Sequence, residues 1–455
     1  MKPVKSPRQP YRWQTAACQF LLDGGSCLAL DPGLGKSFAA LLADKDLAYF
    51  KHPMLICCPP VAIGVWQSEI KMVWDDARVH VLTSDKPIPT EPFDFCLVSI
   101  DLPARNRDVA HQIETHLWRR LIIDEAHKCK TFDSARTQFW LTGKDAIAHI
   151  VGVTWLLTGT PAPNGRCSEV YSLVDATQPE RLSRFTGRTP AKAYEAFCEY
   201  YMDYKVIMIG GSPKRQIKGN NAARMKDFAE TIKGWMLRIK KTDAGLPAKI
   251  RRVIPLAVAD LKLYDDFLHT DEGYQLAQAI QRGDPDLLQH FDGSLSRMRK
   301  LLSKSKVPAV MDWLMEAIDA GDHKIVCFAW HTETIAELEK LLKAAGVMTV
   351  KVTGANSQAD RTKAVALFQN HLGPIVFLGN IAAAGVAVTL TASRRVVFAE
   401  ASWVPGDNMQ AEDRCHRIGQ TGTVVIDYLT ASDTLDTALL GSVARKIADV
   451  EAIGA

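Results

Sequence analysis

The stretch Asp31-Pro32-Gly33-Leu34-Gly35-Lys36-Ser37 contains residue types suited to holding phosphate groups. It follows a short apolar run and opens a helical pattern, and its glycines let backbone N–H groups approach an anion at the start of a helix. Lys36 would reach the β- and γ-phosphates of a nucleotide, and Ser37 would hold Mg²⁺. The alternative is a glycine-rich turn between a strand and a helix, without a ligand. The sequence favours a phosphate loop made of Asp31, Pro32, Gly33, Leu34, Gly35, Lys36 and Ser37.

Two adjacent acids, Asp124 and Glu125, follow the apolar run 121–123 and precede Ala126 and His127. Acidic side chains at the end of a buried strand are unfavourable unless they have a partner or a task. Beside a phosphate loop, Asp124 would orient Mg²⁺ and Glu125 would polarise an attacking water. A helix-capping Asp beside a surface Glu is the alternative. Together the two motifs predict an ATP site in which Lys36, Asp124 and Glu125 are catalytic.

A third motif, Thr158-Gly159-Thr160, lies at the end of another apolar run. Its hydroxyls could bond to the segment that carries His127 and relay the state of the nucleotide. A strand-to-loop turn with hydroxyl caps is the alternative. We therefore interpret His127, Thr158, Gly159 and Thr160 as coupling residues.

The fourth motif is the run Gln410 to Gln420. Gln410, Arg414 and Arg417 have i, i+4, i+7 spacing, which predicts one shared helix face. Two arginines on that face could reach the γ-phosphate of ATP, and an arginine finger accelerates hydrolysis by roughly 10³–10⁵. The alternative is an exposed helix whose acids pair with its basic neighbours.

Two blocks of alternating apolar runs and helical patterns must position these motifs. The predicted strands of the first block are 27–30, 55–58, 95–100, 121–123 and 155–157, with helices at 37–50 and 61–73. The predicted strands of the second block are 324–329, 347–352, 375–378, 395–398 and 424–429, with a helix at 334–345. Continuous apolar strands separated by helices indicate parallel sheets covered on both faces. The fold class is therefore α/β with two lobes.

The region from about 175 to 306 shows few strand signals and is predicted to form helices, loops and the lobe connection. Gly210-Gly211-Ser212-Pro213 and Gly219-Asn220-Asn221 are expected as turns or exposed loops.

The composition is that of a globular protein, with 47% hydrophobic and 23% charged residues. A net charge of +4 does not by itself indicate a nucleic-acid partner. None of the ten cysteines has C-x-x-C spacing, so we expect buried, reduced thiols. We expect no signal peptide and no membrane span, and a location in the cytoplasm (with the nucleoid or in a phage-infected cell) or, in a eukaryote, the nucleus.

With these motifs in this order, the chain resembles the superfamily 2 ATPases of the Swi/Snf type, and among them the HARP-like annealing-helicase branch. The phosphate loop is similar to the family's D-E-M-G-L-G-K-T, and that family also lacks a leading glycine at the position of Leu30. Residues 236–249 resemble the family's M-L-R-R-x-K…L-P-x-K linker, and 306–310 its K-I-P-S-V. The run from Gln410 to Gln420 is close to the family's own string.

The resemblance implies two RecA-like parallel-sheet lobes with helical protrusions between them. Lobe 1 would span 1–240 with a protrusion at about 176–235, a linker would span 241–255, and lobe 2 would span 256–455 with a protrusion at about 256–306. Trp13-Gln14 matches the family's adenine-recognition element, and 382–390 its motif joining ATP and DNA contacts. The implied ATP-binding residues outside the phosphate loop are Gln14, Gly385 and Gln410, and Arg414 and Arg417 would be catalytic.

Basic clusters support a DNA partner independently of the resemblance. Residues 205–226 contain six basic residues and no acid, 294–306 five and no acid, and 233–252 seven and one acid. Phosphate neutralisation dominates affinity for DNA, although solvated faces are the alternative for each cluster. Taken with the resemblance, the candidate DNA contacts are Pro59, Pro60, Ser99, Lys240, Lys241, Arg297, Arg299, Lys300, Lys304, Lys306 and Trp403.

The function implied is a DNA-dependent ATPase, using ATP and Mg²⁺, that translocates on duplex or branched DNA in remodelling, repair, recombination or replication. A strand-separating DEAH-type helicase is the alternative within the same class. A non-catalytic DNA-binding scaffold is the alternative from another class.

Overall fold

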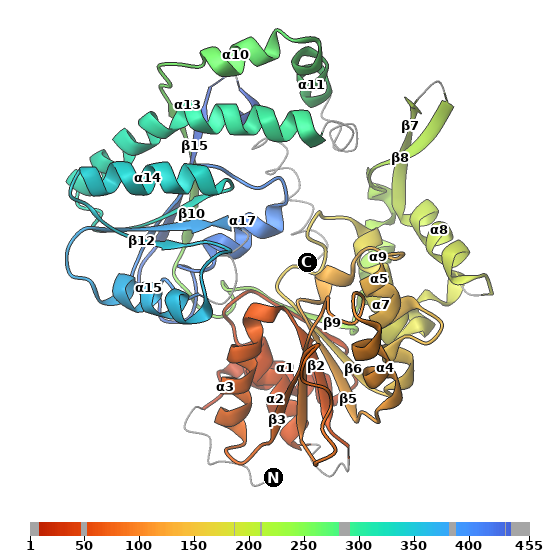
Figure 1. Cartoon of the computed structure of the whole chain (residues 1–455). Coiled ribbons are helices and arrows are strands. Elements are labelled where there is room, and N and C mark those ends of the chain that lie inside the picture. The colour runs from red at the N-terminus through yellow and green to blue at the C-terminus, as the bar shows by residue number, and fades with distance from the viewer. Residues whose placement is uncertain are drawn as a thin grey trace. The chain divides into compact units, whose positions relative to one another are not determined.

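The computed structural model describes residues 9–46, 52–185, 187–209, 212–281, 292–381, 388–432 and 434–437. The chain divides into two compact units, which meet in sequence between Ala244 and Gly245. Each unit is built around a parallel β-sheet with helices (Figure 1), so the predicted fold class is confirmed. No helix in the described part of the chain is long and apolar enough to cross a bilayer.

The sheet of unit 1 has seven strands in the order β3-β4-β2-β5-β6-β1-β9. All their pairings are parallel. The strands are β1 (Cys27–Leu30), β2 (Met54–Cys58), β3 (Val79–Leu82), β4 (Phe95–Ser99), β5 (Arg120–Asp124), β6 (Thr154–Thr158) and β9 (Met236–Ile239). Because β5, β6, β1 and β9 are neighbours and run parallel, the loops that follow them all leave the sheet at the carboxyl ends of the strands.

Helices cover both faces of this sheet. The helices of unit 1 are α1 (Arg12–Leu22), α2 (Lys36–Asp46), α3 (Ile63–Val73), α4 (Arg107–Thr115), α5 (Ala135–Thr137), α6 (Ile147–Ile150), α7 (Tyr171–Thr177), α8 (Pro190–Tyr201) and α9 (Met225–Ile232). The sequence of α4 shows why it forms: Asn106 caps its first turn, and Val109 and Ile113 point from one side into the core. Alternate strand residues such as Cys57 and Ile123 belong to one continuous apolar core that also includes residues of α4, α7, α8 and α9.

The sheet of unit 2 has six strands in the order β10-β15-β14-β11-β13-β12, also parallel throughout. The strands are β10 (Lys249–Leu256), β11 (Lys324–Ala329), β12 (Met348–Val352), β13 (Ile375–Asn380), β14 (Arg395–Phe398) and β15 (Val424–Ala431). The helices are α10 (Lys262–Leu268), α11 (Asp271–Gln281), α13 (Asp292–Asp319), α14 (Thr332–Ala344), α15 (Gln358–Asn370) and α17 (Pro405–Glu412).

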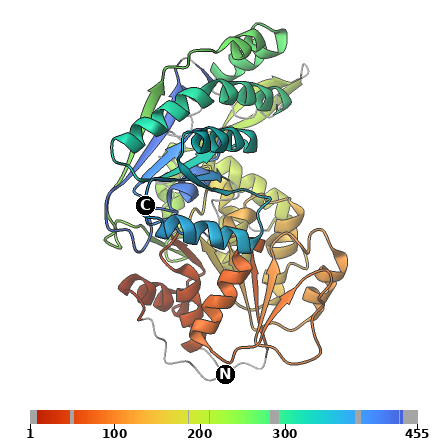
Figure 2. The same ribbon diagram turned by 60° about the vertical axis from the view of Figure 1, so that its left-hand side comes forward.

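The period of two along β11 explains how both faces of this sheet are covered. Ile325 and Cys327 pack in a core with α13 and α14, whereas Val326 and Phe328 pack in a second core with α15 and α17. Figure 2 shows these helices on either side of the strands.

Three parts of the sequence prediction are wrong. The region expected to be helical contains an antiparallel hairpin of β7 (Met202–Ile209) and β8 (Ser212–Asn220), which extends from α8 in Figure 1. Gly219 and Asn220 end a strand instead of forming a turn. Of the other expected turn, Ser212 and Pro213 begin β8, and Gly210 and Gly211 lie outside the described residues. Most of the second half of the predicted linker is strand β10.

Charged residues explain why the sequence pattern did not predict strand β10. Lys249, Arg251 and Arg252 interrupt the apolar pattern of β10, but their charges pair with Glu412 and Asp427 of the same unit. The cations therefore do not oppose the pairing of β10 with β15. The ten cysteines are buried free thiols, as expected.

Candidate functional site

The loop after β1 has the backbone that its glycines predicted. Gly33 and Gly35 have φ values of 89° and 77°, which only glycine adopts without strain. Lys36 begins α2, and its Nζ donates to the carbonyl oxygen of Leu30 at 3.1 Å. The lysine side chain is therefore folded back across the loop, and Ser37 follows it on the first turn of the helix.

Helix α1 supports this loop through the carbonyl oxygen of Leu34. Trp13 Nε1 donates to it at 3.1 Å, and Gln14 Nε2 donates to it at 3.0 Å. The other end of the Gln14 amide accepts from the Tyr11 backbone N–H at 3.0 Å. A Cβ on Gly35 would lie 2.2 Å from Gln14 Nε2. Buried Gln14 is therefore packed against the phosphate loop itself.

The acid pair lies at the end of β5. Asp124 Oδ2 accepts from Trp66 Nε1 at 2.9 Å, and Asp124 Oδ1 accepts from the backbone N–H of Glu125 at 3.0 Å. Burial and the charge of Glu125 raise the pKa of Asp124 to about 6, against the lowering effects of the Trp66 hydrogen bond and of Lys36. Glu125 has a φ of 53°, the one positive φ of a non-glycine residue in the described ranges. Such left-handed backbone is concentrated at functional sites.

His127 lies between this pair and the third motif. His127 Nδ1 lies 3.3 Å from Glu125 Oε2 and 3.0 Å from Thr158 Oγ1. Thr158 Oγ1 also accepts from the Thr160 backbone N–H at 3.1 Å. Burial lowers the pKa of His127, so the imidazole is neutral at pH 7. The contact that the sequence suggested between the two motifs is therefore present.

Arg238, at the end of β9, is a residue to which sequence reasoning gave no role in the site. Its Nη2 lies 2.7 Å from Asp31 Oδ1, and its Nη1 donates to the carbonyl oxygens of Ala29 and Gly159 at 2.8 and 3.0 Å. A Cβ on Gly159 would lie 2.8 Å from the ring of Pro32. Arg238 thus ties the phosphate loop to the third motif. Trp66 was missed as well, and neither spacing nor composition distinguishes it from a core tryptophan.

The oxygen donors at this edge suit Mg²⁺ better than a metal held by protein alone. No group of three or more His, Cys, Asp or Glu side chains suited to a metal occurs in the part of the chain that the structure describes. Mg²⁺ usually takes one or two protein oxygens together with substrate phosphates and water. Ser37 and Asp124 can supply those two oxygens, so the residues fit the ion.

In unit 2, the predicted single helix face is wrong. Helix α17 ends at Glu412, so Gln410 lies on the helix whereas Arg414 and Arg417 lie in the turns that follow it. The Arg414 carbonyl oxygen accepts from the Leu390 backbone N–H at 2.8 Å, and Arg417 Nη1 donates to the Val388 carbonyl oxygen at 3.4 Å. These contacts bring the two arginines beside the motif that contains Gly385, which itself lies outside the described residues.

Glu412 anchors that segment. It is fully buried and accepts from Lys249, Arg251 and the hydroxyl of Tyr428. Burial tends to raise the pKa of Glu412, but the charges of Lys249 and Arg251 outweigh it and lower the pKa. The buried carboxylate is therefore ionised and fixes the end of α17 on β10.

The candidate DNA contacts do not share one environment. Pro59, Pro60 and Ser99 lie at the carboxyl ends of β2 and β4. The phosphate loop and the acid pair lie at this same end of the sheet. Lys240 and Trp403 are half-buried, and Lys241 is buried. On α13, the exposed cations are Arg297, Lys300 and Lys304, and Lys300 Nζ pairs with Glu333 at 2.6 Å. Arg299 turns inward, where it donates to the Ala401 carbonyl oxygen at 2.8 Å.

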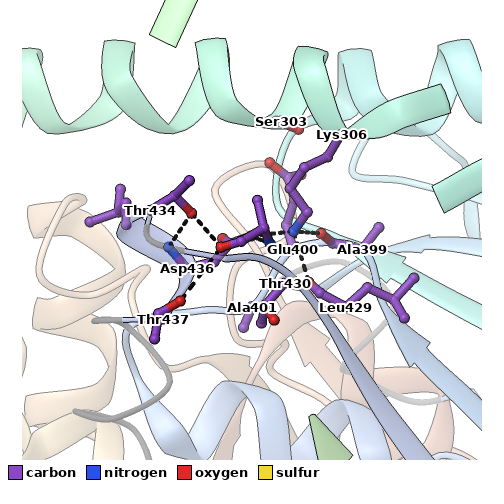
Figure 3. A network of polar contacts seen from close by, with 12 residues as sticks. Ser303, Lys306, Ala399, Glu400, Ala401, Leu429, Thr430, Thr434, Asp436 and Thr437 are labelled. Atoms are coloured by element: carbon purple, nitrogen blue, oxygen red, sulfur yellow. Dashed lines mark hydrogen bonds and ion pairs between the residues drawn. The ribbon is translucent and has the colours of Figure 1, made fainter. Parts of the chain in front are cut away.

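The prediction that Lys306 contacts DNA is wrong. Its ammonium group donates to the carbonyl oxygens of Ala399 and Leu429, each at 2.8 Å, and pairs with Asp436 (Figure 3). The residue is 2% exposed. Lys306 therefore has no donor left for a DNA phosphate, and its role is to join α13 to the ends of β14 and β15.

Comparisons with known proteins agree with the order of motifs. The sequence model for the SNF2-related domain matches residues 16–305, and that for the helicase conserved C-terminal domain matches 306–419. The human DNA annealing helicase and endonuclease ZRANB3 is 28% identical over 435 residues, covering 93% of this chain and 38% of its own. A Caenorhabditis elegans homolog of SWI/SNF-related matrix-associated actin-dependent regulator of chromatin subfamily A-like protein 1 is 26% identical, covering 96% and 60%. The chain thus spans less than two thirds of either relative.

Among solved structures, the Sulfolobus solfataricus SWI2/SNF2 ATPase core in complex with double-stranded DNA is similar at a TM-score of 0.45. It is 22% identical, and the match covers 96% of this chain and 91% of that one.

Proposed function

This chain belongs to the SNF2-related family, and from that premise we propose that it hydrolyses ATP and couples hydrolysis to translocation along duplex or branched DNA. Membership confirms the Swi/Snf-type resemblance drawn from the motifs. The relatives include proteins named as annealing helicases, as expected for the HARP-like branch. The relatives are named as a DNA annealing helicase and as a regulator of chromatin, and these names support an activity on DNA.

The observation that carries the proposal is the convergence of three motifs at one edge of the first sheet. Arg238 joins the phosphate loop to Gly159, and His127 bonds to Thr158 and lies beside Glu125. A glycine-rich turn without a ligand would not need a buried acid pair and a neutral histidine beside it. This edge also lies at the carboxyl ends of parallel strands, where α/β proteins bind ligands.

Each residue then has a defined part in hydrolysis. Lys36 and the loop amides hold the phosphates of ATP, and Ser37 and Asp124 hold Mg²⁺, which when bound offsets the negative charge of the transferred phosphoryl group. Glu125 accepts a hydrogen bond from the attacking water, and neutral His127 orients the carboxylate of Glu125. The catalytic role that the resemblance implies for Arg414 and Arg417 stays a prediction. Gln14 keeps the loop in shape, and the adenine role implied by the resemblance stays a prediction.

We propose that Pro59, Pro60, Ser99, Lys240, Trp403 and the exposed cations of α13 contact DNA. Lys241, Arg299 and Lys306 are left out, because Lys241 and Lys306 are buried and Arg299 turns inward. The basic cluster at 233–252 is also a weaker candidate for DNA binding than its charge suggests. Arg238, Lys249, Arg251 and Arg252 pair with carboxylates of their own units. Four of the seven basic residues of that cluster are therefore already paired within their own units, which makes them weaker candidates for DNA phosphates.

The test compares steady-state ATP hydrolysis with duplex, forked and single-stranded DNA and with RNA, using Lys36→Ala as the inactive control. We expect the largest stimulation with duplex or forked DNA. Triplex displacement without strand separation on a tailed duplex would identify a translocase, whereas strand separation would identify the helicase alternative. Turnover that no DNA raises above the Lys36→Ala background would contradict the proposal and favour the scaffold.

A further inference from the structure

Trp66 is a buried tryptophan of α3 whose indole reaches the acid pair. Its Nε1 donates to Asp124 Oδ2 at 2.9 Å, across a sequence separation of 58 residues. Trp66 is 1% exposed, so water does not compete for this hydrogen bond. An indole N–H can only donate, so Asp124 Oδ2 is held as an acceptor from one fixed direction.

The two oxygens of Asp124 are held from different directions. Oδ2 is held by α3 through Trp66, and Oδ1 is held by the backbone N–H of Glu125 at 3.0 Å. With a donor on each oxygen, the plane of the carboxylate is fixed, and its remaining lone pairs are left for a metal ion or its water shell. Partners that orient a metal ligand typically contribute 10–100-fold to metal affinity or activity.

We propose that Trp66 is a positioning residue for Asp124 that sets the affinity of the site for its divalent cation. The inference rests on the proposed ATP-hydrolysing function and adds to it a residue outside the sequence motifs. A purely structural role, in which Trp66 only fills the core under α3, predicts loss of stability without a change in metal affinity.

Trp140 provides a matched control in the same unit. It is 0% exposed, and its indole Nε1 donates to the backbone carbonyl oxygen of Ile100 at 2.8 Å. Trp66→Phe and Trp140→Phe therefore remove the same buried indole hydrogen bond, but only the first removes it from a carboxylate of the site.

The experiment measures Mn²⁺ affinity by electron paramagnetic resonance, on the full chain in the presence of a non-hydrolysable ATP analogue. We expect Trp66→Phe to weaken Mn²⁺ binding at least tenfold, within the range of about 10–100-fold for such partners, and Trp140→Phe to leave it within about twofold of wild type. Affinity for the analogue without metal should be equal in all three proteins. In ATP hydrolysis, Trp66→Phe should lower kcat at saturating ATP, and raised Mn²⁺ should recover part of the loss.

Circular dichroism melts establish that the variants are folded at the assay temperature. If Trp66→Phe is not folded, Trp66→Leu is compared with Trp140→Leu by the same titration, because a leucine side chain has no hydrogen-bond donor. Equal Mn²⁺ affinity in the paired variants would overturn the role of Trp66. The absence of both metal–nucleotide binding and ATP hydrolysis in the wild-type chain would instead overturn the proposed function.

Discussion

Lys306 allows a stability prediction to be worked out from its contacts. In Lys306→Met the aliphatic stem remains, but three interactions disappear: those with the carbonyl oxygens of Ala399 and Leu429 and the ion pair with Asp436. Asp436 is then left without its cation, and two buried carbonyl oxygens are left without this donor. The substitution therefore loosens the connection of α13 to the ends of β14 and β15.

Removing one partner of a buried ion pair costs about 3–5 kcal/mol. The side chain of Asp436 is 18% exposed, and water can partly solvate the stranded carboxylate. We therefore take the lower end, about 3 kcal/mol. A domain of about 200 residues loses roughly 2–4 °C in Tm per kcal/mol, so the expected decrease is about 6–12 °C.

Differential scanning calorimetry of the full chain measures this decrease in the transition of unit 2. Lys304→Met is the matched control, because Lys304 lies on the same helix but is exposed. It should lower Tm by less than about 2 °C, as surface substitutions stay within about 0.5 kcal/mol. The double variant Lys306→Met/Asp436→Leu should recover part of the loss, since neither partner is then unpaired. Equal melting of the two single variants would refute the reasoning.

The remaining predictions concern the proposed ATP and DNA sites. Lys36→Ala and Glu125→Gln should both abolish hydrolysis, but nucleotide titrations should show that only Glu125→Gln still binds ATP; near wild-type turnover in either would contradict the assignment. Arg417→Ala should lower DNA-stimulated turnover on the order of 10³-fold with little change in ATP affinity. Equal losses in rate and affinity would make Arg417 a ground-state ligand. Arg297→Glu with Lys304→Glu should reduce the slope of log affinity for DNA against log salt by about 0.9 per lost phosphate contact, and an unchanged slope would mean that these cations are only solvated.

Local patterns predicted the two sheets well. The apolar runs at 27–30, 324–329 and 395–398 coincide with β1, β11 and β14. These strands are buried on both faces, so their apolar character is continuous and their limits are sharp. Where a strand carries charges that its own unit neutralises, as in β10, the pattern is lost. The prediction of one helix face for Gln410, Arg414 and Arg417 was wrong for a different reason. Periodicity indicates which residues could share a face, but not where the helix ends.

The site was predictable to the extent that it consists of loops after successive strands. In a parallel sheet all these loops leave one edge, so the phosphate loop and the acid pair had to lie near each other once the strands were assigned. The side chains that fix their geometry were not predictable, because they come from elements brought together only by packing. Trp66 reaches Asp124 from α3, and Arg238 reaches Asp31 from β9.

The geometry of the proposed site depends on how other elements of unit 1 pack against it. Three residues of the proposed site in unit 1 are held by a side chain from another element: Leu34 by Gln14, Asp31 by Arg238 and Asp124 by Trp66. A shift of α1, α3 or β9 would therefore change the position of a phosphate or metal ligand without altering any motif residue. Hydrolysis can then respond to what those elements contact, and α3 begins only three residues after Pro60, a proposed DNA contact. The motifs specify which chemistry is possible, and the packing of these three elements determines when the groups are in position for it.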